Sequence, residues 1–240
     1  LNNKVTDGTQ AWYQTLGTDD YPVLSGKTVY LTSTNEYTND SSAVCSHSKY
    51  TNGFCDECGK IETPILTDGK YQIANYGKLV WFQEYVDGGE FGASAVLTAD
   101  ITANESLLSD GKVSGTPKYT WKPIRQSAGS SANAYSGEFD GQGYTIRGLY
   151  VPYSSSNHCA LFGKSKGTIK NTFITDSYFG GSVCNNASSF VGEGYNNCVI
   201  ENCGSDAVVS GNEYCGGIAG STLGTIKNCY FAGKITASSN

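Results

Sequence analysis

The chain has 240 residues and a formal net charge of −6, which allows one large domain or two small ones with a buried core. This acidic balance excludes partners that bind through a dominant basic surface, such as nucleic acid or an anionic membrane. The 30 Gly and 17 Tyr residues, against 5 Pro, 3 Trp and only 16% charged residues, favour short strands joined by turns over a helical bundle.

The sequence carries no recognisable targeting or membrane segment. No apolar stretch approaches the roughly 20 residues that cross a bilayer, and no signal peptide precedes the first element. Met is absent throughout. We therefore expect a piece of a longer protein, whose other parts hold any export or anchoring signal.

The first 34 residues are predicted to be the tail of an upstream β-rich unit. Residues 11–24 are aromatic-rich and contain a Gly-Thr-Asp-Asp turn, and residues 27–31 have the composition of a strand. The segment is too short to bury a core of its own. Residues 35–70 are predicted to be a linker, polar over 35–42, that holds a small cysteine module.

The cysteine module has the spacing Cys-x-His-x7-Cys-x2-Cys-Gly, formed by Cys45, His47, Cys55, Cys58 and Gly59. Two thiolates from one tight turn, followed by a glycine that can adopt positive φ, are typical of a zinc knuckle. We predict that the Cys3His set binds one structural Zn²⁺ in a closed site, because so small a module needs a metal or a crosslink to fold. The alternative is disulfide formation, which suits an exported chain but cannot pair three cysteines and gives His47 no role.

Residues 71–134 are predicted to form a cap and the entry strands of the main fold. A helix is expected over residues 77–86, capped by Asn75 and stopped by the Gly-Gly pair at 88–89. Its apolar positions, at spacings of three and four, are Tyr76, Leu79, Phe82 and Val86.

Two strands should follow this helix. Alternating apolar residues from Ala93 to Ile101 predict a half-buried strand, and residues 119–124 predict a short one with Trp121 as a core anchor. Residues 103–115 and 127–133 are expected to be loops.

Residues 135–240 contain an imperfect repeat. Gly163, Gly192 and Gly220 are 29 and 28 residues apart, and each precedes a similar segment: Thr-Ile-Lys-Asn-Thr at 168–172, Val-Ile-Glu-Asn-Cys at 199–203 and Thr-Ile-Lys-Asn-Cys at 225–229. Self-similarity at this period indicates stacked units that cannot bury their faces alone. Two short strands and a glycine corner in each unit predict a mainly β fold, a right-handed parallel β-helix (solenoid).

The repeats resemble a known family. Residues 216–220 (Gly-Gly-Ile-Ala-Gly) and 224–230 (Gly-Thr-Ile-Lys-Asn-Cys-Tyr) resemble the GLUG repeat of surface proteins from gut and oral bacteria and of IgA-specific metallopeptidases. Residues 135–149 resemble the rung that usually precedes such repeats, residues 73–124 their usual entry, and residues 12–24 the closing rung of an upstream copy. The copy at 189–192 lacks the double glycine. The resemblance implies a right-handed β-helix in a secreted or cell-surface bacterial protein, and no chemistry for the repeat.

Six further cysteines lie in the repeats: Cys159, Cys184, Cys198, Cys203, Cys215 and Cys229. Cys203 and Cys229 share a frame position and should stack on neighbouring rungs. We expect a ladder of small buried thiols, since stacked Cβ atoms about 4.8 Å apart suit a disulfide poorly; disulfides between rungs are the alternative. The asparagines of the same frame, Asn171, Asn202 and Asn228, should form a ladder.

No residue set in the sequence amounts to an active site. Glu138 and Asp140 project to one side of a strand, but no third acid or basic cluster accompanies them, and Asp140 suits a turn. His158 is the sole histidine outside the cysteine module, which leaves no material for a Ser-His-Asp centre. We predict no catalytic residues and no organic cofactor.

These observations predict a non-catalytic structural or adhesive segment of a secreted or cell-surface bacterial protein. Such a segment displays a β-helix to host glycan or protein, binds no nucleic acid and is monomeric. Two alternatives stay open: a β-helix carbohydrate-active enzyme, either a lyase or a hydrolase, and an accessory module of a large secreted peptidase.

Overall fold

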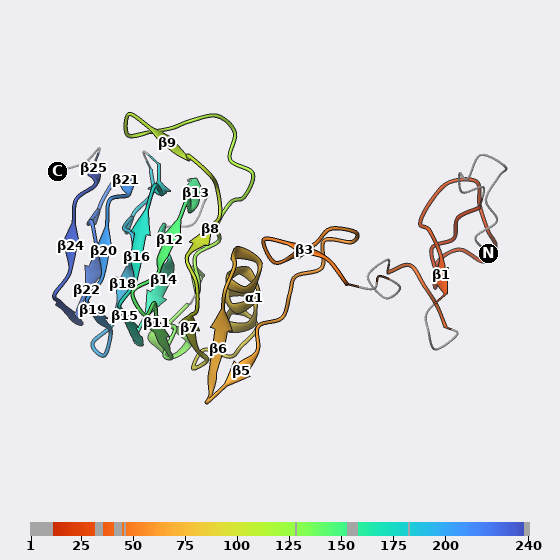
Figure 1. Cartoon of the computed structure of the whole chain (residues 1–240), viewed down its shortest axis with the longest axis horizontal. Helices are drawn as coiled ribbons and strands as arrows, with labels where there is room; N and C mark the ends of the chain where they lie inside the picture. Colours follow the sequence, from red (N-terminus) through yellow and green to blue (C-terminus); the bar gives the residue numbers. More distant parts are fainter. Residues whose placement is uncertain are drawn as a thin grey trace. The chain divides into compact units, whose positions relative to one another are not determined.

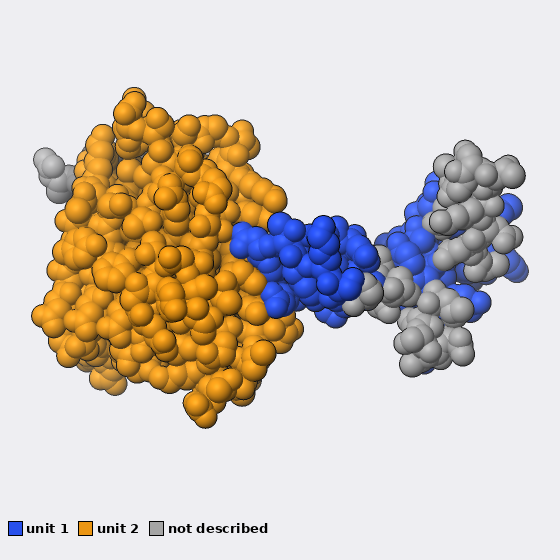
Figure 2. Space-filling view, viewed as in Figure 1, with its two compact units in different colours: residues 1–62 blue, residues 63–240 orange. Residues whose placement is uncertain are grey.

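The computed structural model describes residues 12–31, 36–40, 45, 47–127, 129–152, 158–181 and 183–237. The chain divides into two compact units, residues 1–62 and 63–240, which Figure 2 colours separately. Residues 1–11 and 32–34 of the predicted upstream unit, and residues 35, 41–44 and 46 of the predicted linker, lie outside the described residues.

The first part of the smaller unit is held by a two-stranded pairing and one asparagine. Strand β1 (Tyr30–Leu31) pairs antiparallel with β2 (Tyr37–Thr38). The side-chain amide of Asn39 donates to the carbonyls of Gln14, at 2.7 Å, and Thr28, at 2.8 Å. Residues 37–39 of the predicted polar linker therefore belong to a folded element.

The larger unit is a parallel β-helix, as the sequence predicts (Figure 1). Each full turn passes through four short strands, and each of these strands joins a different sheet. Sheet 1 contains β5 (Leu66–Thr67), β6 (Lys70–Ile73), β7 (Ser94–Leu97), β11 (Glu138–Asp140), β15 (Thr168–Lys170), β19 (Val199–Glu201) and β23 (Thr225–Lys227). Sheet 2 contains β8 (Ile101–Thr102), β12 (Thr145–Arg147), β16 (Phe173–Thr175), β20 (Gly204–Ser205) and β24 (Tyr230–Phe231). Sheet 3 contains β13 (Tyr150–Pro152), β17 (Tyr178–Gly180), β21 (Val208–Gly211) and β25 (Lys234–Ala237), and sheet 4 contains β14 (Phe162–Ser165), β18 (Val191–Gly194) and β22 (Ala219–Thr222).

One repeat of the sequence is one turn of the solenoid, because equivalent residues pair directly. Phe139, Ile169, Ile200 and Ile226 are partners in successive strands of sheet 1. The first three are fully buried, whereas Ile226, in the last turn, is 43% exposed. The core is therefore a set of apolar columns that run along the solenoid axis.

The periodic glycines stack in one column of sheet 4. A Cβ atom built on Gly192 lies 2.8 Å from the carbonyl oxygen of Gly163, and one built on Gly220 lies 2.7 Å from that of Gly192. Side chains do not tolerate contacts of this length with backbone. Glycine therefore recurs every 29 and 28 residues because consecutive turns approach closely at this position.

The predicted helix lies between the strands β6 and β7 of sheet 1 in the chain. Helix α1 (Tyr76–Asp87) is capped by Asn75, whose side chain accepts from the backbone N–H of Lys78 at 2.9 Å. All four of its predicted apolar positions are buried. Before it, β5 and β6 form a hairpin at the edge of sheet 1, so residues 63–70, which the sequence assigned to the linker, belong to the larger unit.

Two of the predicted strands differ from the elements that the structure contains. The apolar run from Ala93 to Ile101 is not one strand, because the chain turns a corner between β7 and β8. Residues 119–124 form only an isolated bridge at Ile124. Trp121 is nevertheless buried, and its indole N–H donates to the carbonyl of Leu161 at 3.2 Å, which confirms it as a core anchor.

The two predicted loops contain short elements. Strands β9 (Leu108–Ser109) and β10 (Lys112–Val113) form an antiparallel hairpin within residues 103–115. A single 3-10 turn, η2 (Ser131–Asn133), lies within residues 127–133. Among the described residues, no helix has the length and apolar character that crossing a membrane requires.

The glycine column gives a first prediction. Gly192→Ala should lower the free energy of unfolding by about 1–3 kcal/mol, because the added methyl must push two turns apart, and Tm should fall by at least about 3 °C. Gly129→Ala is the matched control, since a Cβ there has no atom within 4 Å. Thermal unfolding followed by circular dichroism compares the two variants, and equal Tm values would contradict the stacking.

Candidate metal centre and polar clusters

The cysteine module is built on a tight hairpin. Strands β3 (Tyr50–Thr51) and β4 (Phe54–Cys55) pair antiparallel through a turn at Asn52 and Gly53, whose φ values are 50° and 81°. Asn-Gly with both φ values positive is the preferred two-residue hairpin turn. After β4 the chain folds back, and the backbone N–H of Gly59 donates to the Cys55 carbonyl at 2.8 Å. The hairpin thereby fixes the turn that holds the two cysteines of the Cys-x-x-Cys pair.

The four predicted ligands lie together. The candidate ligand atoms of Cys45, His47, Cys55 and Cys58 all lie within 4.8 Å of one another. The Sγ atoms of Cys45 and Cys55 are 3.3 Å apart, and Cys58 Sγ is 3.5 Å from His47 Nδ1. Bonds of about 2.3 Å to sulfur and about 2.05 Å to nitrogen give a tetrahedron with edges of roughly 3.5–3.8 Å. All three thiols are free, so this group could hold a metal ion.

The module also contains a carboxylate that sequence reasoning did not assign. Cys45 Sγ lies 3.1 Å from Glu57 Oε2. The backbone N–H of His47 lowers the pKa of the Cys45 thiol, but Glu57 and burial outweigh it and raise that pKa to about 12. In contrast, hydrogen bonds from the His47 side chain and the Cys58 backbone lower the pKa of Cys55 to about 6. A metal ion must therefore displace a proton at Cys45 but meets a thiolate at Cys55.

On sheet 1 of the solenoid, Glu138 lies between two lysines. Its carboxylate accepts from Lys70 Nζ at 2.6 Å and from Lys170 Nζ at 2.8 Å, and Asp140 lies 3.6 Å from Lys170. The lysines come from other turns, so the sequence, which found Glu138 and Asp140 without basic partners, missed this cluster. Charges of opposite sign also face each other in the next turns, where Lys227 pairs with Glu201 at 3.0 Å.

The protonation of this cluster suits an ion-pair ladder. The hydrogen bond from Lys170 lowers the pKa of Glu138, and the hydrogen bond to Glu138 raises the pKa of Lys170. A general acid needs a raised carboxyl pKa and a lysine base needs a lowered ammonium pKa. Both shifts therefore run opposite to those of a catalytic pair.

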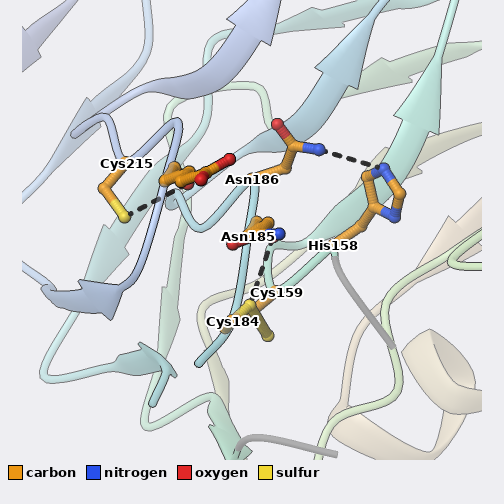
Figure 3. The surroundings of a disulfide bond; sticks show 7 residues. His158, Cys159, Cys184, Asn185, Asn186 and Cys215 are labelled. Carbon is orange, nitrogen blue, oxygen red and sulfur yellow. Dashed lines mark hydrogen bonds between the residues drawn. A yellow bond between two sulfur atoms is a disulfide. The ribbon is translucent and has the colours of Figure 1, made fainter. Parts of the chain in front are cut away.

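A second polar cluster lies on sheet 4. His158 Nε2 is 3.2 Å from Glu193 Oε2, which also pairs with Lys164 at 3.2 Å. Asn186 Nδ2 lies 3.3 Å from the same histidine nitrogen (Figure 3). Burial lowers the pKa of His158, and the charge of Lys164 lowers it further. A signal for this cluster was present in the sequence, since Lys164 and Glu193 each follow a glycine of the repeat.

Beside this cluster, Cys159 and Cys184 form a disulfide (Figure 3). The expectation of free thiols is wrong for this pair. Loops between the strands bring the two residues together, so their spacing of 25 residues does not follow the repeat. The expectation holds for Cys198 and Cys203, which are free and buried, whereas the free cysteines Cys215 and Cys229 are only partly buried.

The remaining ladder residues have structural contacts. The Cys203 thiol donates to the carbonyl of Glu201 at 3.2 Å, and Cys229 repeats this bond with Lys227 at 3.2 Å. Asn202 Nδ2 donates to Asn171 Oδ1 at 3.1 Å, which confirms the first step of the asparagine ladder. The three ladder asparagines have φ values of 51–53°, so each forms a sharp corner between sheets 1 and 2.

Comparisons with known proteins give one sequence relative and one structural relative. No protein-family model matches the chain. The chain is 30% identical over 175 residues, 68% of its length, to Halomucin of Haloquadratum walsbyi (strain DSM 16790 / HBSQ001), but it spans only 2% of that protein. The crystal structure of a candidate immunoglobulin A1 protease from Bacteroides ovatus is similar, with a TM-score of 0.50 and 20% identity over 72% of this chain and 60% of that chain. This likeness supports the β-solenoid fold, which is compatible with a GLUG-type repeat.

The buried histidine gives a pH prediction. Because the pKa of His158 is lowered in the folded state, the unfolded state binds more protons than the folded state near neutral pH. The free energy of unfolding is therefore highest above the unfolded histidine pKa of about 6.5. It decreases as the pH falls through that value. Tm should fall between about pH 7.5 and 5.5, above the range in which the carboxylates titrate. His158→Gln should flatten this slope. A variant that keeps the slope of the parent chain would show that other groups carry it.

Proposed function

We propose that the chain is a non-catalytic display segment of an exported bacterial protein, in which GLUG-type turns present their outer faces to glycan or protein. One observation carries this proposal: the acids and lysines that converge on sheet 1 neutralise one another across turns. Glu138 has a lysine on each side at hydrogen-bonding distance. The lowered pKa of Glu138 and the raised pKa of Lys170 both have the wrong sign for acid–base chemistry.

An extracellular setting is supported by the disulfide. Cys159 and Cys184 are bonded, and disulfides persist in oxidising compartments. Closing a loop of 25 residues stabilises a fold by roughly 3 kcal/mol. The sequence similarity to Halomucin and the structural similarity to a candidate immunoglobulin A1 protease support an exported repeat protein, in line with the GLUG resemblance.

Two enzymatic alternatives have weaker support. A carbohydrate-active enzyme needs acids and lysines to converge, and they do converge at Glu138, but in a closed set of ion pairs. An accessory role beside a peptidase is suggested by the named activity of the structural relative. In this alternative the peptidase centre lies in another part of the full-length protein.

We further propose that the metal of the cysteine module is zinc with a structural role. Three thiolates and one imidazole form a donor set that zinc favours, and four protein ligands close the site to substrate. The module has little apolar core: of its residues between 45 and 59, Gly53 and Cys55 are buried. Zinc would therefore supply much of the free energy that orders this hairpin.

Zinc binding is tested by metal analysis of the purified chain. We expect about one zinc ion per chain, and less than about 0.1 in Cys58→Ser or His47→Ala. Cys215→Ser, which removes a free thiol of the solenoid, should keep full zinc content. Cobalt substitution should give the visible absorption of a tetrahedral thiolate site. Undiminished zinc in Cys58→Ser, or a disulfide between Cys45 and Cys55 in the isolated protein, would contradict the proposal.

Display outside the cell is tested on the full-length protein in the producing organism. Antibodies against the solenoid should label intact cells or bind protein from the medium. Peptide mapping of that protein without reduction should recover Cys159 linked to Cys184. Glu138→Gln should leave any activity of the full-length protein on polysaccharide unchanged. Protein confined to the cytosol with both cysteines reduced, or a loss of polysaccharide cleavage in Glu138→Gln, would overturn the proposal.

A further inference from the structure

A groove of about 580 Å³ runs along the outer face of sheet 3. Its volume lies within the range of small-molecule sites, roughly 300–1,000 Å³. Its lining includes residues from all four strands of sheet 3 and from the β9–β10 hairpin. It lies on a different sheet from the ion-pair ladder and from the His158 cluster.

The register of the sheet creates the floor of this groove. One outward row contains Tyr150, Tyr178, Val208 and Lys234, which are partners in successive strands. The adjacent outward row contains small or compact residues, Pro152, Gly180, Ser210 and Thr236, in the same register. A row of large side chains beside a row of small ones leaves a channel that crosses the strands. The four strands are separated by three spacings of about 4.8 Å, so the channel is roughly 14 Å long, which suits an extended chain of several rings.

The hairpin forms one wall of the groove, and Asp176 fixes it there. The Asp176 carboxylate accepts from the backbone N–H groups of Leu107, at 3.0 Å, and Leu108, at 2.8 Å, and from Arg147 at 3.1 Å. The wall also approaches the floor, since a Cβ built on Gly111 would lie 3.9 Å from Lys234 Cδ. The groove is thus largely preformed, which lowers the ordering cost of binding.

Two tyrosines give the groove an aromatic platform. The rings of Tyr150 and Tyr178 lie 5.9 Å apart with an angle of 38° between them, and both side chains are partly exposed. Rings held at the spacing of the turns offer successive apolar faces with polar hydroxyl groups at their edges. The flat C–H faces of sugar rings pack on such platforms, while Ser210 and Thr236 offer hydroxyl groups to sugar hydroxyls.

The charged side chains of the groove are basic. Lys112 and Lys234 are the charged residues of its lining, and both are exposed. Within the described part of the chain, neither ammonium group forms an ion pair. The acids of the adjoining hollow, Asp176 and Asp206, already accept hydrogen bonds from backbone N–H groups. In a chain with a net charge of −6, two unpaired lysines beside an aromatic platform form a local positive site.

We propose that this groove binds an acidic oligosaccharide through stacking on Tyr150 and Tyr178 and ion pairing with Lys112 and Lys234. The inference rests on the proposed display function and names the class of glycan that the solenoid contacts. The shared chemistry is a sugar chain that carries carboxylate or sulfate groups.

Calorimetric titration of the whole chain tests the proposal with four probes at 50 and 300 mM NaCl. Tetragalacturonate carries carboxylates, a κ-carrageenan tetrasaccharide carries sulfates, cellotetraose is neutral, and tetraglutamate is an acidic peptide. At least one acidic sugar should bind at least tenfold more tightly than cellotetraose and tetraglutamate, and salt should weaken it. The stronger of the two acidic sugars identifies the anionic group.

Variants then locate the site. Tyr178→Ala should weaken binding at least tenfold, whereas Tyr178→Phe should stay within threefold because it keeps the ring. The double variant Lys112→Gln, Lys234→Gln should lose at least tenfold in affinity and most of the salt dependence. Tyr214→Ala and Lys227→Gln, which change an exposed tyrosine between β21 and β22 and a lysine on sheet 1, are the controls. Circular dichroism melting checks that each variant is folded.

Four results would overturn the proposal: no binding of either acidic sugar at millimolar concentration, equal binding of cellotetraose, equal binding of tetraglutamate, or affinity unchanged by the groove variants. If any of these occurs while antibodies still label the cell surface, only the glycan assignment fails. If surface labelling fails as well, the display function itself is wrong.

Discussion

The structure of the larger unit depends on one constraint, the parallel pairing of each strand with its equivalent one turn away. Backbone hydrogen bonds hold consecutive turns about 4.8 Å apart, so a residue type at a given frame position must suit the same residue above and below it. This explains the isoleucine column of sheet 1, the glycine column of sheet 4 and the asparagine corners between sheets 1 and 2. A shift of one residue in any turn would reverse the inward and outward side chains of its strands.

The same register organises the outer surface. On sheet 1 it aligns Asp140, Lys170, Glu201 and Lys227 in one outward row of alternating charge. Lys170 also reaches Glu138 diagonally, at 2.8 Å, so the charges neutralise one another. On sheet 3 it places two tyrosine rings in line and leaves small residues beside them. One surface is thereby electrostatically closed, and the other is open to a ligand. The floor of the proposed groove therefore follows from the repeat register, whereas its wall and Lys112 come from the β9–β10 hairpin.

The parts of the structure that could be predicted are those encoded locally or periodically. The glycine period and the shared Ile-x-Asn segments predict the β-helix, and the apolar spacing from Tyr76 to Val86 predicts helix α1. The Cys-x-x-Cys-Gly turn predicts the Cys/His group that could hold a metal ion. Boundaries within the cap were predicted less well, because the corner between β7 and β8 depends on pairing with distant strands.

The features that could not be predicted depend on contacts between residues that do not occupy equivalent positions of the repeat. The Cys159–Cys184 disulfide joins two inter-strand loops, and the β9–β10 hairpin reaches its place through Asp176, 68 and 69 residues away from the amides that it accepts from. Lys70 donates to Glu138, 68 residues away in the sequence.

The central claim is the register, and a crystal structure of the chain tests it most directly. We predict that Phe139, Ile169, Ile200 and Ile226 lie in one inward column, with Lys170 and Glu201 outward. A register in which Lys170 or Glu201 faces the core, or in which these four residues fall in different columns, would contradict the account.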